Sequence, residues 1–381
     1  MRFAVLPSID EQLNDEYFKT KGKNDTNSYF VTGLKNEIKK RGDEIHTIDK
    51  YDDLKEVDYI IVNWPRWAEL RKIILGKYNS KKRSSLSPKE ILSKMIYVNA
   101  EPTSVLPINS PNGYETLKQI FPIILTWNRE WTDDKSIFRK NIPYPFYVDF
   151  GHLKYEKKKL LTAITADKYS NEPGELYSER RKVYSFFEKN YPDDFDFYGI
   201  RWHKEEHPGY KGTVADKTST FQKYKFAICL ENTKGDMDYV TEKIYDCLCA
   251  GIVPIYGGAK NISEYVPSDC YIDYFSFESY EEMAKYISEM SREEYDGYIS
   301  RIKAFLENVD KYPISIEKYV EQLYDAISKK NELFKAADAE VTKTPTPEGI
   351  QYVKQMGLNE SLWNKLVEIK HKYWKKANKA K

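Results

Sequence analysis

Short apolar runs alternate with helical patterns along the chain, and this alternation restricts the possible folds more than any other feature. In the first half such runs lie at residues 2–6, 57–62, 95–98 and 120–125. Between the first two, Phe30, Leu34 and Ile38 recur at every fourth position, and Gly42 stands where a helix end prefers glycine. Strands that alternate with helices form parallel sheets covered on both faces. Residues 1–155 are therefore predicted to form a Rossmann-like lobe.

The alternation restarts near residue 160 and predicts a second lobe over residues 156–335. Its expected elements are a strand at 160–164, a helix at 176–190, a strand at 226–230 and a helix at about 239–250. Asp238 suits the N-cap of the last helix and Gly251 its end. Pro254 cannot donate to a ladder, so it marks an edge, a bend or the end of its strand. Residues 336–381 are predicted to be a helical, lysine-rich tail.

Charge and cysteine content limit the function classes. With 60 basic and 59 acidic residues among 381, the net charge is +1, which argues against a broad grip on nucleic acid. No run approaches the roughly 18 apolar residues of a membrane span, and residues 2–6 are too short for a signal peptide. The four cysteines have no CxxC spacing, so buried reduced thiols are favoured over disulfides or a zinc site. A cytoplasmic protein is expected.

A strand, a glycine-containing loop and a helix follow one another over residues 224–250. The first turn of such a helix presents free N–H groups and the positive end of its dipole, which suits an anion. Tyr239, Glu242 and Lys243 are spaced so that one helix face would carry all three. Lys243 suits a phosphate, Glu242 ribose hydroxyls and Tyr239 packing with a further hydrogen bond. The spacing alone leaves open an ordinary surface helix.

The same region carries a longer pattern. Between Tyr224 and Asp273 the chain reads, in order, FAICLEN, DYVTEK, AGIVPIYGG and YID. This order resembles the donor-binding signature of the α1,3/α1,4-fucosyltransferases. Looser matches extend over about residues 95–280 and include Asn99-Ala-Glu101-Pro102 and Leu125-Thr-Trp-Asn-Arg129. The resemblance implies an α/β protein of two Rossmann-like lobes with a cleft between them (GT-B architecture), which uses GDP-fucose and inverts the anomeric centre.

Residue roles follow from the resemblance. It implies that Arg180 and Lys243 neutralise the diphosphate and that Glu101 is the general base. Donor-binding roles fall on Asn232, Tyr239, Glu242, Tyr198 and Gly199. Arg181 stands beside Arg180, and Arg180 is favoured because Val183 and Phe187 would form the buried stripe of its helix. These residue types suit the reaction, because cations beside the departing GDP stabilise the transition state more than the ground state.

Two patterns suggest a metal, and both have a simpler interpretation. Asp236-Met237-Asp238 spells a DxD motif, but Asp238 is better used as a helix cap. His203 and His207 are four apart, and Pro208 directly after them disfavours the helix that would pair them. No metal site and no required cofactor are therefore predicted, although stimulation by a divalent metal remains open.

The sequence leaves the acceptor, the linkage and the oligomeric state open. An α1,3 transfer to a glycan of the GlcNAc or Glc type, such as a lipid-linked oligosaccharide or lipopolysaccharide precursor, is the leading hypothesis. The alternatives are another nucleotide sugar as donor, or a non-catalytic glycan- or nucleotide-binding protein. Animal relatives carry an N-terminal membrane anchor, so a bacterial-type enzyme is expected here. Residues 358–381 are expected either to pack on the body with a solvated basic end or to contact the inner face of a membrane.

Overall fold

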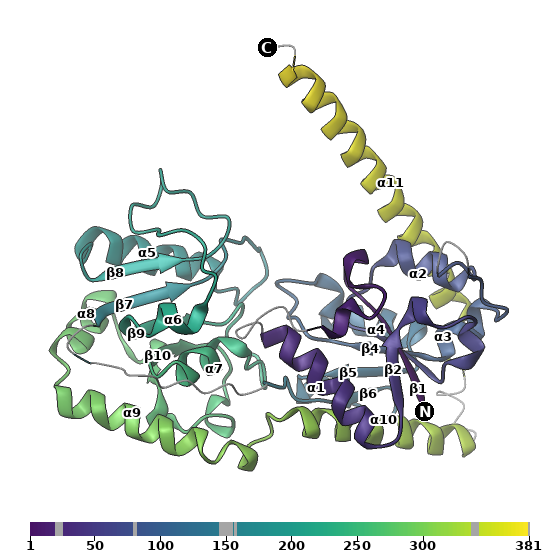
Figure 1. The fold of residues 1–381 in the computed structure, drawn as a ribbon, viewed down its shortest axis with the longest axis horizontal. Helices are drawn as coiled ribbons and strands as arrows, with labels where there is room; N and C mark the ends of the chain where they lie inside the picture. The colour runs from purple at the N-terminus through teal and green to yellow at the C-terminus, as the bar shows by residue number, and fades with distance from the viewer. Residues whose placement is uncertain (20–25, 79–81, 145–154, 156–157, 337–342, 380–381) are drawn as a thin grey trace.

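The computed structural model contains two lobes, each built on one parallel sheet (Figure 1). It describes residues 1–19, 26–78, 82–144, 155, 158–336 and 343–379, except for the side chains of 26–28 and 366–379. Two Rossmann-like lobes are what the alternation of runs predicts. No helix in this described part is long and apolar enough to cross a membrane.

The first lobe has a six-stranded sheet in the order β2-β1-β3-β4-β5-β6. Its strands are β1 (Arg2–Leu6), β2 (Glu44–Thr47), β3 (Tyr59–Val62), β4 (Met95–Val98), β5 (Ile123–Thr126) and β6 (Ile137–Arg139). Its helices are α1 (Thr26–Lys40), α2 (Trp67–Ile74), α3 (Pro88–Ser93) and α4 (Pro111–Ile120). Successive residues of one strand enter separate apolar clusters, as Ile60 and Ile61 do. Both faces of this sheet are therefore buried.

The second lobe has a five-stranded sheet in the order β11-β10-β9-β7-β8. Its strands are β7 (Lys159–Ile164), β8 (Phe195–Tyr198), β9 (Tyr224–Leu230), β10 (Val253–Gly257) and β11 (Ile272–Asp273). Its helices are α5 (Tyr177–Asn190), α6 (Lys217–Phe221), α7 (Glu242–Cys249), α8 (Tyr280–Glu289) and α9 (Arg292–Leu306). All four cysteines are free and buried, as predicted. Pro254 is the second residue of β10 and pairs with Ala227, while β11 pairs only from Ile255 onward. Its missing N–H therefore removes no bond to β11.

The last two helices depart from the predicted boundaries. Helix α10 (Ile316–Lys335) falls in the range expected for the second lobe, yet Tyr319, Leu323 and Ile327 are buried in the core of the first (Figure 1). Its apolar face covers a sheet face that the first lobe's own helices leave open. Helix α11 (Pro347–Lys379) begins before Leu358, where the sequence pattern becomes clear, and packs on α2 and α4. Beyond that contact it projects away from the body (Figure 1).

Candidate functional site

Both sheets direct the carboxyl ends of their strands to one cavity of about 750 Å³ between the lobes. In each sheet the strand order reverses next to the first strand, between β1 and β3 and between β7 and β9. Ligands of open α/β sheets bind at such switch points. The cavity is lined by residues that follow the strands at these places, among them Ser8, Asn63, Glu101, Thr165, Gly199 and Asn232. The fold alone therefore brings segments far apart in the sequence to one site.

Gly199 shows how closely these strand ends approach. Its φ is +140°, and a Cβ placed on it would lie 1.6 Å from the main-chain oxygen of Thr165. Only glycine fits this position, because the contact is with backbone that cannot move aside. Gly199 lines the cavity as a piece of main chain that follows β8. The predicted donor-binding residue is thus at the cavity wall.

The amino end of α7 supplies one cation to the cavity. Lys243 Nζ lies 3.0 Å from Glu231 Oε2 and 2.9 Å from Thr241 Oγ1. Glu231 is fully buried at the end of β9 and also accepts from the N–H and hydroxyl of Thr241. Burial alone would lower the pKa of Lys243, but the carboxylates of Glu231 and Glu242 outweigh it and raise that pKa. Lys243 therefore stays charged at neutral pH.

Glu242 is held ionised by the same group of charges. Burial would raise its pKa, but Lys243 and Lys217 lower it to about 2. Lys217 in turn donates to Asp246 Oδ2 at 2.8 Å, and both Glu242 and Lys217 line the cavity. An ionised carboxylate that reaches the cavity accepts hydrogen bonds from donors such as ribose hydroxyls.

A hydrogen-bonded chain joins the second lobe to Glu101 of the first. Arg180 Nη2 donates to the main-chain oxygens of Leu230 and Glu231, at 2.6 and 2.7 Å, and to Asn232 Oδ1 at 3.2 Å. Asn232 Nδ2 donates to the hydroxyl of Tyr239 at 3.1 Å, and that hydroxyl donates to Glu101 Oε2 at 3.4 Å. The residues predicted to bind donor and to act as base are therefore in one connected cluster.

Glu101 stands on a loop fixed by buried amides. Its N–H donates to Asn99 Oδ1 at 3.0 Å, and its main-chain oxygen accepts from Asn109 Nδ2 at 2.7 Å. Burial raises the pKa of Glu101; Glu242 adds to the rise, and Lys243 opposes it. A carboxylate with a raised pKa accepts a proton more readily than an ordinary one, which is what a general base requires.

Several predicted details are corrected. Helix α7 begins at Glu242 with Thr241 as N-cap, so Tyr239 lies in the preceding loop and shares no helix face with Lys243. Asp238 is not a cap: its φ is +67°, and its carboxylate is bonded to Arg129 of the first lobe. Tyr198 does not line the cavity, because its hydroxyl is bonded to that of Tyr224 at 2.9 Å.

Of the two adjacent arginines, Arg180 lines the cavity and Arg181 does not. Arg180 is 2% exposed, and its Nε has no hydrogen-bond partner within the described part of the chain. Arg181 instead pairs with Asp167 at 2.9 Å and donates to the main-chain oxygen of Lys168. The helical stripe of Val183 and Phe187, both fully buried, explains this orientation.

The sequence interpretation missed three charged residues at the site. Glu231 belongs to the FAICLEN segment and directly follows β9, and an acid at the end of an apolar strand is a signal in itself. Lys168 lies in the loop after β7, where burial and neighbouring cations lower its pKa. Lys140 follows β6 and is 3% exposed. Nothing in the local pattern distinguishes these lysines from surface ones.

Asp238 and His207, one residue from each metal pattern, have other partners in the structure. Within the described residues no group of three or more histidine, cysteine or acidic side chains could hold a metal ion. Asp238 is already engaged by arginine, tyrosine and asparagine donors. His207 Nδ1 lies 2.8 Å from Glu188 Oε2, so this histidine is partnered away from the cavity.

Comparison with known proteins agrees with the geometry. Residues 155–325 match the model of glycosyltransferase family 10 (fucosyltransferase), C-terminal part. The match thus covers most of the second lobe, which is similar to the C-terminal part of that family. The matched range contains every segment between Tyr224 and Asp273 that carries the resemblance noted in the sequence.

Curated relatives match over short stretches of this chain. An Arabidopsis thaliana α-(1,4)-fucosyltransferase is 43% identical over 67 residues, which is 18% of this chain and 16% of that protein. Mouse 4-galactosyl-N-acetylglucosaminide 3-α-L-fucosyltransferase 9 is 34% identical over 97 residues, 24% of this chain and 27% of the relative. The matches thus span less than a third of the length of either relative.

Solved structures agree over most of the chain. An α1,3-fucosyltransferase crystal structure superposes with a TM-score of 0.51 at 16% identity and covers 86% of this chain and 90% of its own. A DNA-modifying β-glucosyltransferase gives 0.50 at 12% identity over 86% of this chain and all of its own, 100%. At these identities the likeness shows the fold, a GT-B architecture of two lobes. The predicted fold class is confirmed.

The environment of Lys140 gives a first prediction. Its ammonium makes one long hydrogen bond, 3.4 Å to the main-chain oxygen of Asn141, and burial lowers its pKa to about 7 although Glu101 opposes the shift. The unfolded chain binds this proton up to a pKa near 10.4, so the lysine destabilises the fold fully below pH 7 and progressively less above it. Lys140→Met should therefore raise the melting temperature at pH 6 by about 2–4 °C or more, and by less at pH 9.

Thermal unfolding at both pH values measures this difference, with Lys39→Met on the exposed end of α1 as control. A Met variant that melts below the wild type at pH 6, or an increase that is the same at both pH values, would show that Lys140 carries no desolvation penalty.

Proposed function

We propose that this protein transfers L-fucose from GDP-fucose to a hydroxyl of an acceptor glycan, with inversion of the anomeric centre. One observation carries the proposal: Glu101 of the first lobe faces Lys243 and Arg180 of the lobe similar to family 10 in one cavity. An inverting transfer needs a base on one side of the sugar and cations on the other. The Tyr239 hydroxyl, bonded to Glu101 and to Asn232, marks where the two halves of such a site meet.

In this mechanism the second lobe stabilises the leaving group. Breaking the sugar–phosphate bond develops negative charge on GDP, and fixed cations in a cavity shielded from water stabilise that charge strongly. Lys243 supplies a point charge balanced by buried Glu231, and Arg180 supplies the guanidinium Nε that has no partner among the described residues. Asn232, Tyr239, Glu242 and the main chain at Gly199 would hold the nucleotide and ribose.

Glu101 would take the proton of the acceptor hydroxyl as that oxygen attacks the fucose carbon. A base placed in this way contributes about 10²- to 10⁴-fold in rate. We further propose that no metal or other cofactor is required, because Lys243 and Arg180 fill the role that a divalent ion has on a diphosphate. The carboxylate of Asp238 is already engaged by Arg129, Tyr265 and Asn261.

For the acceptor and the cellular compartment we propose a class of glycan and a type of environment. An α1,3 linkage to a GlcNAc- or Glc-type residue of an oligosaccharide precursor, lipopolysaccharide included, is the leading assignment, and a bacterial cytoplasmic setting fits it. The four free, buried cysteines suit a reducing compartment. Another nucleotide sugar as donor is the alternative within this fold, and a non-catalytic glycan- or nucleotide-binding protein is the alternative outside it.

A donor panel separates these functions. With a mixture of glycan acceptors, GDP-fucose should support transfer, while other GDP-, UDP- and CMP-sugars should not, because the cluster around Lys243 and Glu242 is the part matched to fucosyltransferases. The product linkage is read by NMR. Lys243→Ala should weaken GDP binding by about 2 kcal/mol or more, the upper range for a charge-assisted hydrogen bond. Unchanged GDP affinity by calorimetry would remove Lys243 from the phosphate site, and turnover with a different donor would select the first alternative.

The base is tested separately from donor binding. Glu101→Gln keeps the shape of the side chain and removes its basicity, so we expect GDP affinity close to wild type and transfer reduced by about 10²- to 10⁴-fold. Rates are measured at saturating GDP-fucose, and Glu16→Gln, an acid elsewhere on the cavity wall, serves as control. Retained turnover in the Gln variant would refute the role of Glu101 as base.

Helix α11 is the proposed point of contact with the inner face of a membrane. Leu358, Leu362 and Trp363 are 41%, 52% and 67% exposed, and lysines crowd the sequence that follows them. Lysines near an anionic surface contribute about 1 kcal/mol each. Deletion of residues 370–381 should therefore reduce sedimentation with vesicles that contain phosphatidylglycerol and leave the weak binding to phosphatidylcholine unchanged. If the full chain does not bind anionic vesicles, the helix end is only a solvated terminus.

A further inference from the structure

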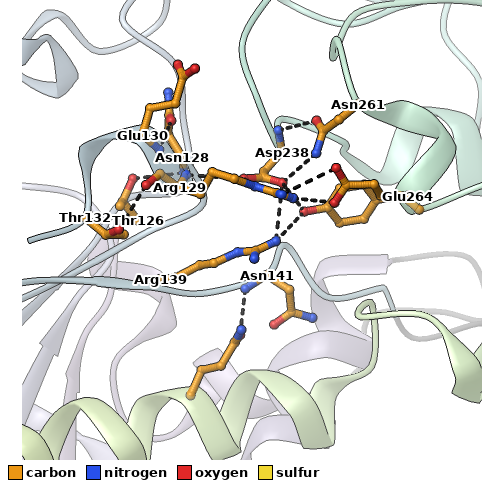
Figure 2. Close-up of polar contacts among 12 residues, drawn as sticks. Thr126, Asn128, Arg129, Glu130, Thr132, Arg139, Asn141, Asp238, Asn261 and Glu264 are labelled. Carbon is orange, nitrogen blue, oxygen red and sulfur yellow. Dashed lines mark hydrogen bonds and ion pairs between the residues drawn. The ribbon is translucent and has the colours of Figure 1, made fainter. Parts of the chain in front are cut away.

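Asp238 is a buried carboxylate to which both lobes donate hydrogen bonds (Figure 2). From the first lobe, Arg129 donates through its main-chain N–H at 3.2 Å, through Nε at 2.7 Å and through Nη2, and Arg139 Nη2 lies at 3.3 Å. From the second lobe, the hydroxyl of Tyr265 donates at 2.7 Å and Asn261 Nδ2 at 2.9 Å. The side chain of Asp238 is only 1% exposed, so its carboxylate is shielded from water, while the side chain of Arg129 is 31% exposed.

Both ends of the ion pair are held rigidly. Asn128 Oδ1 accepts from the N–H of Glu130, and Thr132 Oγ1 donates to the main-chain oxygen of Arg129, so the short turn that carries Arg129 after β5 is fixed (Figure 2). On the other side, Asn261 Oδ1 accepts from the N–H of Asp238 while its Nδ2 donates to the same carboxylate. Asp238 holds a φ of +67°, a conformation that non-glycine residues keep only where surrounding contacts impose it.

The residue that follows Asp238 lies at the candidate site. The ring centroid of Tyr239 lies 4.9 Å from that of Trp127. Trp127 precedes Arg129 by two residues. The hydroxyl of Tyr239 accepts from Asn232 and donates to Glu101. Adjacent residues of one loop thus contact adjacent parts of the first lobe, Asp238 through Arg129 and Tyr239 through Trp127 and Glu101. A shift of Asp238 would therefore move the hydroxyl of Tyr239 relative to the carboxylate of Glu101.

We propose that Asp238 and Arg129 are positioning residues, whose ion pair holds the donor-binding loop of the second lobe against the first lobe and so aligns Tyr239 with Glu101. This inference rests on the proposed function for its effect on rate. The ion pair touches neither donor nor acceptor, because neither Arg129 nor Asp238 lines the cavity. Its contribution is geometric: it fixes the distance between the carboxylate in one lobe and the donor-binding groups of the other.

Asp238→Asn is the sharpest test. Asparagine has the same shape and tolerates a positive φ, so the change removes the charge and leaves the backbone unstrained. Glu264→Gln is the matched control, because Glu264 is also paired with Arg129 but is 49% exposed. We expect Asp238→Asn to lower kcat by about 10²-fold, the effect of a displacement of roughly 1 Å in a catalytic site. The KM for GDP-fucose should change by less than about threefold, because Lys243 and Glu242 are untouched. Glu264→Gln should stay close to wild type in both.

Hydrogen exchange over residues 231–243 gives a readout that does not depend on turnover. The proposal predicts faster exchange there in Asp238→Asn than in Glu264→Gln, with GDP affinity retained. Equal kcat in the two variants, or a loss of kcat that only follows the fraction of folded protein, would overturn it. If the wild type transfers no sugar, the proposed function fails, and unchanged exchange over this segment would then overturn the positioning role independently.

Discussion

The direction of the strands is the constraint on which the site depends. In a parallel sheet every strand ends at the same edge, so the loops that follow the strands gather there whatever their distance along the chain. Here two such edges open into one cavity, and part of its lining comes from the ends of β1, β3, β4, β7, β8 and β9. Neither lobe alone assembles the cluster, because Glu101 belongs to one and Arg180 and Lys243 to the other.

Charge in this cavity is balanced locally. The chain as a whole has a net charge of +1. Lys243 is paired with buried Glu231, and Lys217 is paired with Asp246. These pairs keep the cations ionised in a region of low dielectric, where an isolated lysine tends to lose its proton. Lys140 is the contrast: it has no carboxylate within ion-pair distance in the described part of the chain, and its pKa falls to about 7. Lys243 and Lys217 of the second lobe thus stay charged, while Lys140 of the first lobe gains or loses its proton near neutral pH.

The sequence predicted the lobes because their signals are local. Apolar residues at every fourth position before Gly42 predict α1, and the short apolar runs predict the strands. Both patterns depend only on residues that are close in the sequence. The sequence also predicted that Glu101, Asn232, Glu242 and Lys243 belong to one site, because of the motifs that resemble fucosyltransferases, and all four line one cavity. The assignment of α10 to the second lobe was wrong, because an amphipathic helix shows that one face is buried and not which sheet buries it. Lys140 and Lys168 were missed for the same reason: burial of a lysine is set by distant segments.

Asp238 shows how an interaction between lobes changes the meaning of a local pattern. Taken alone, an aspartate before a helix is a cap, and Asp-x-Asp is a metal motif. The first interpretation assumes that the carboxylate accepts from a free N–H of the helix, and the second assumes that it binds a metal ion. Thr241 caps the helix instead, since it stands directly before α7 and its side chain accepts from the N–H of Lys243. Arg129, more than a hundred residues upstream, then takes the carboxylate (Figure 2). A guanidinium that donates through two groups matches a carboxylate better than a single backbone N–H does. The stronger partner lies in the other lobe, so the loop that begins the donor site is fixed by a residue outside its own domain.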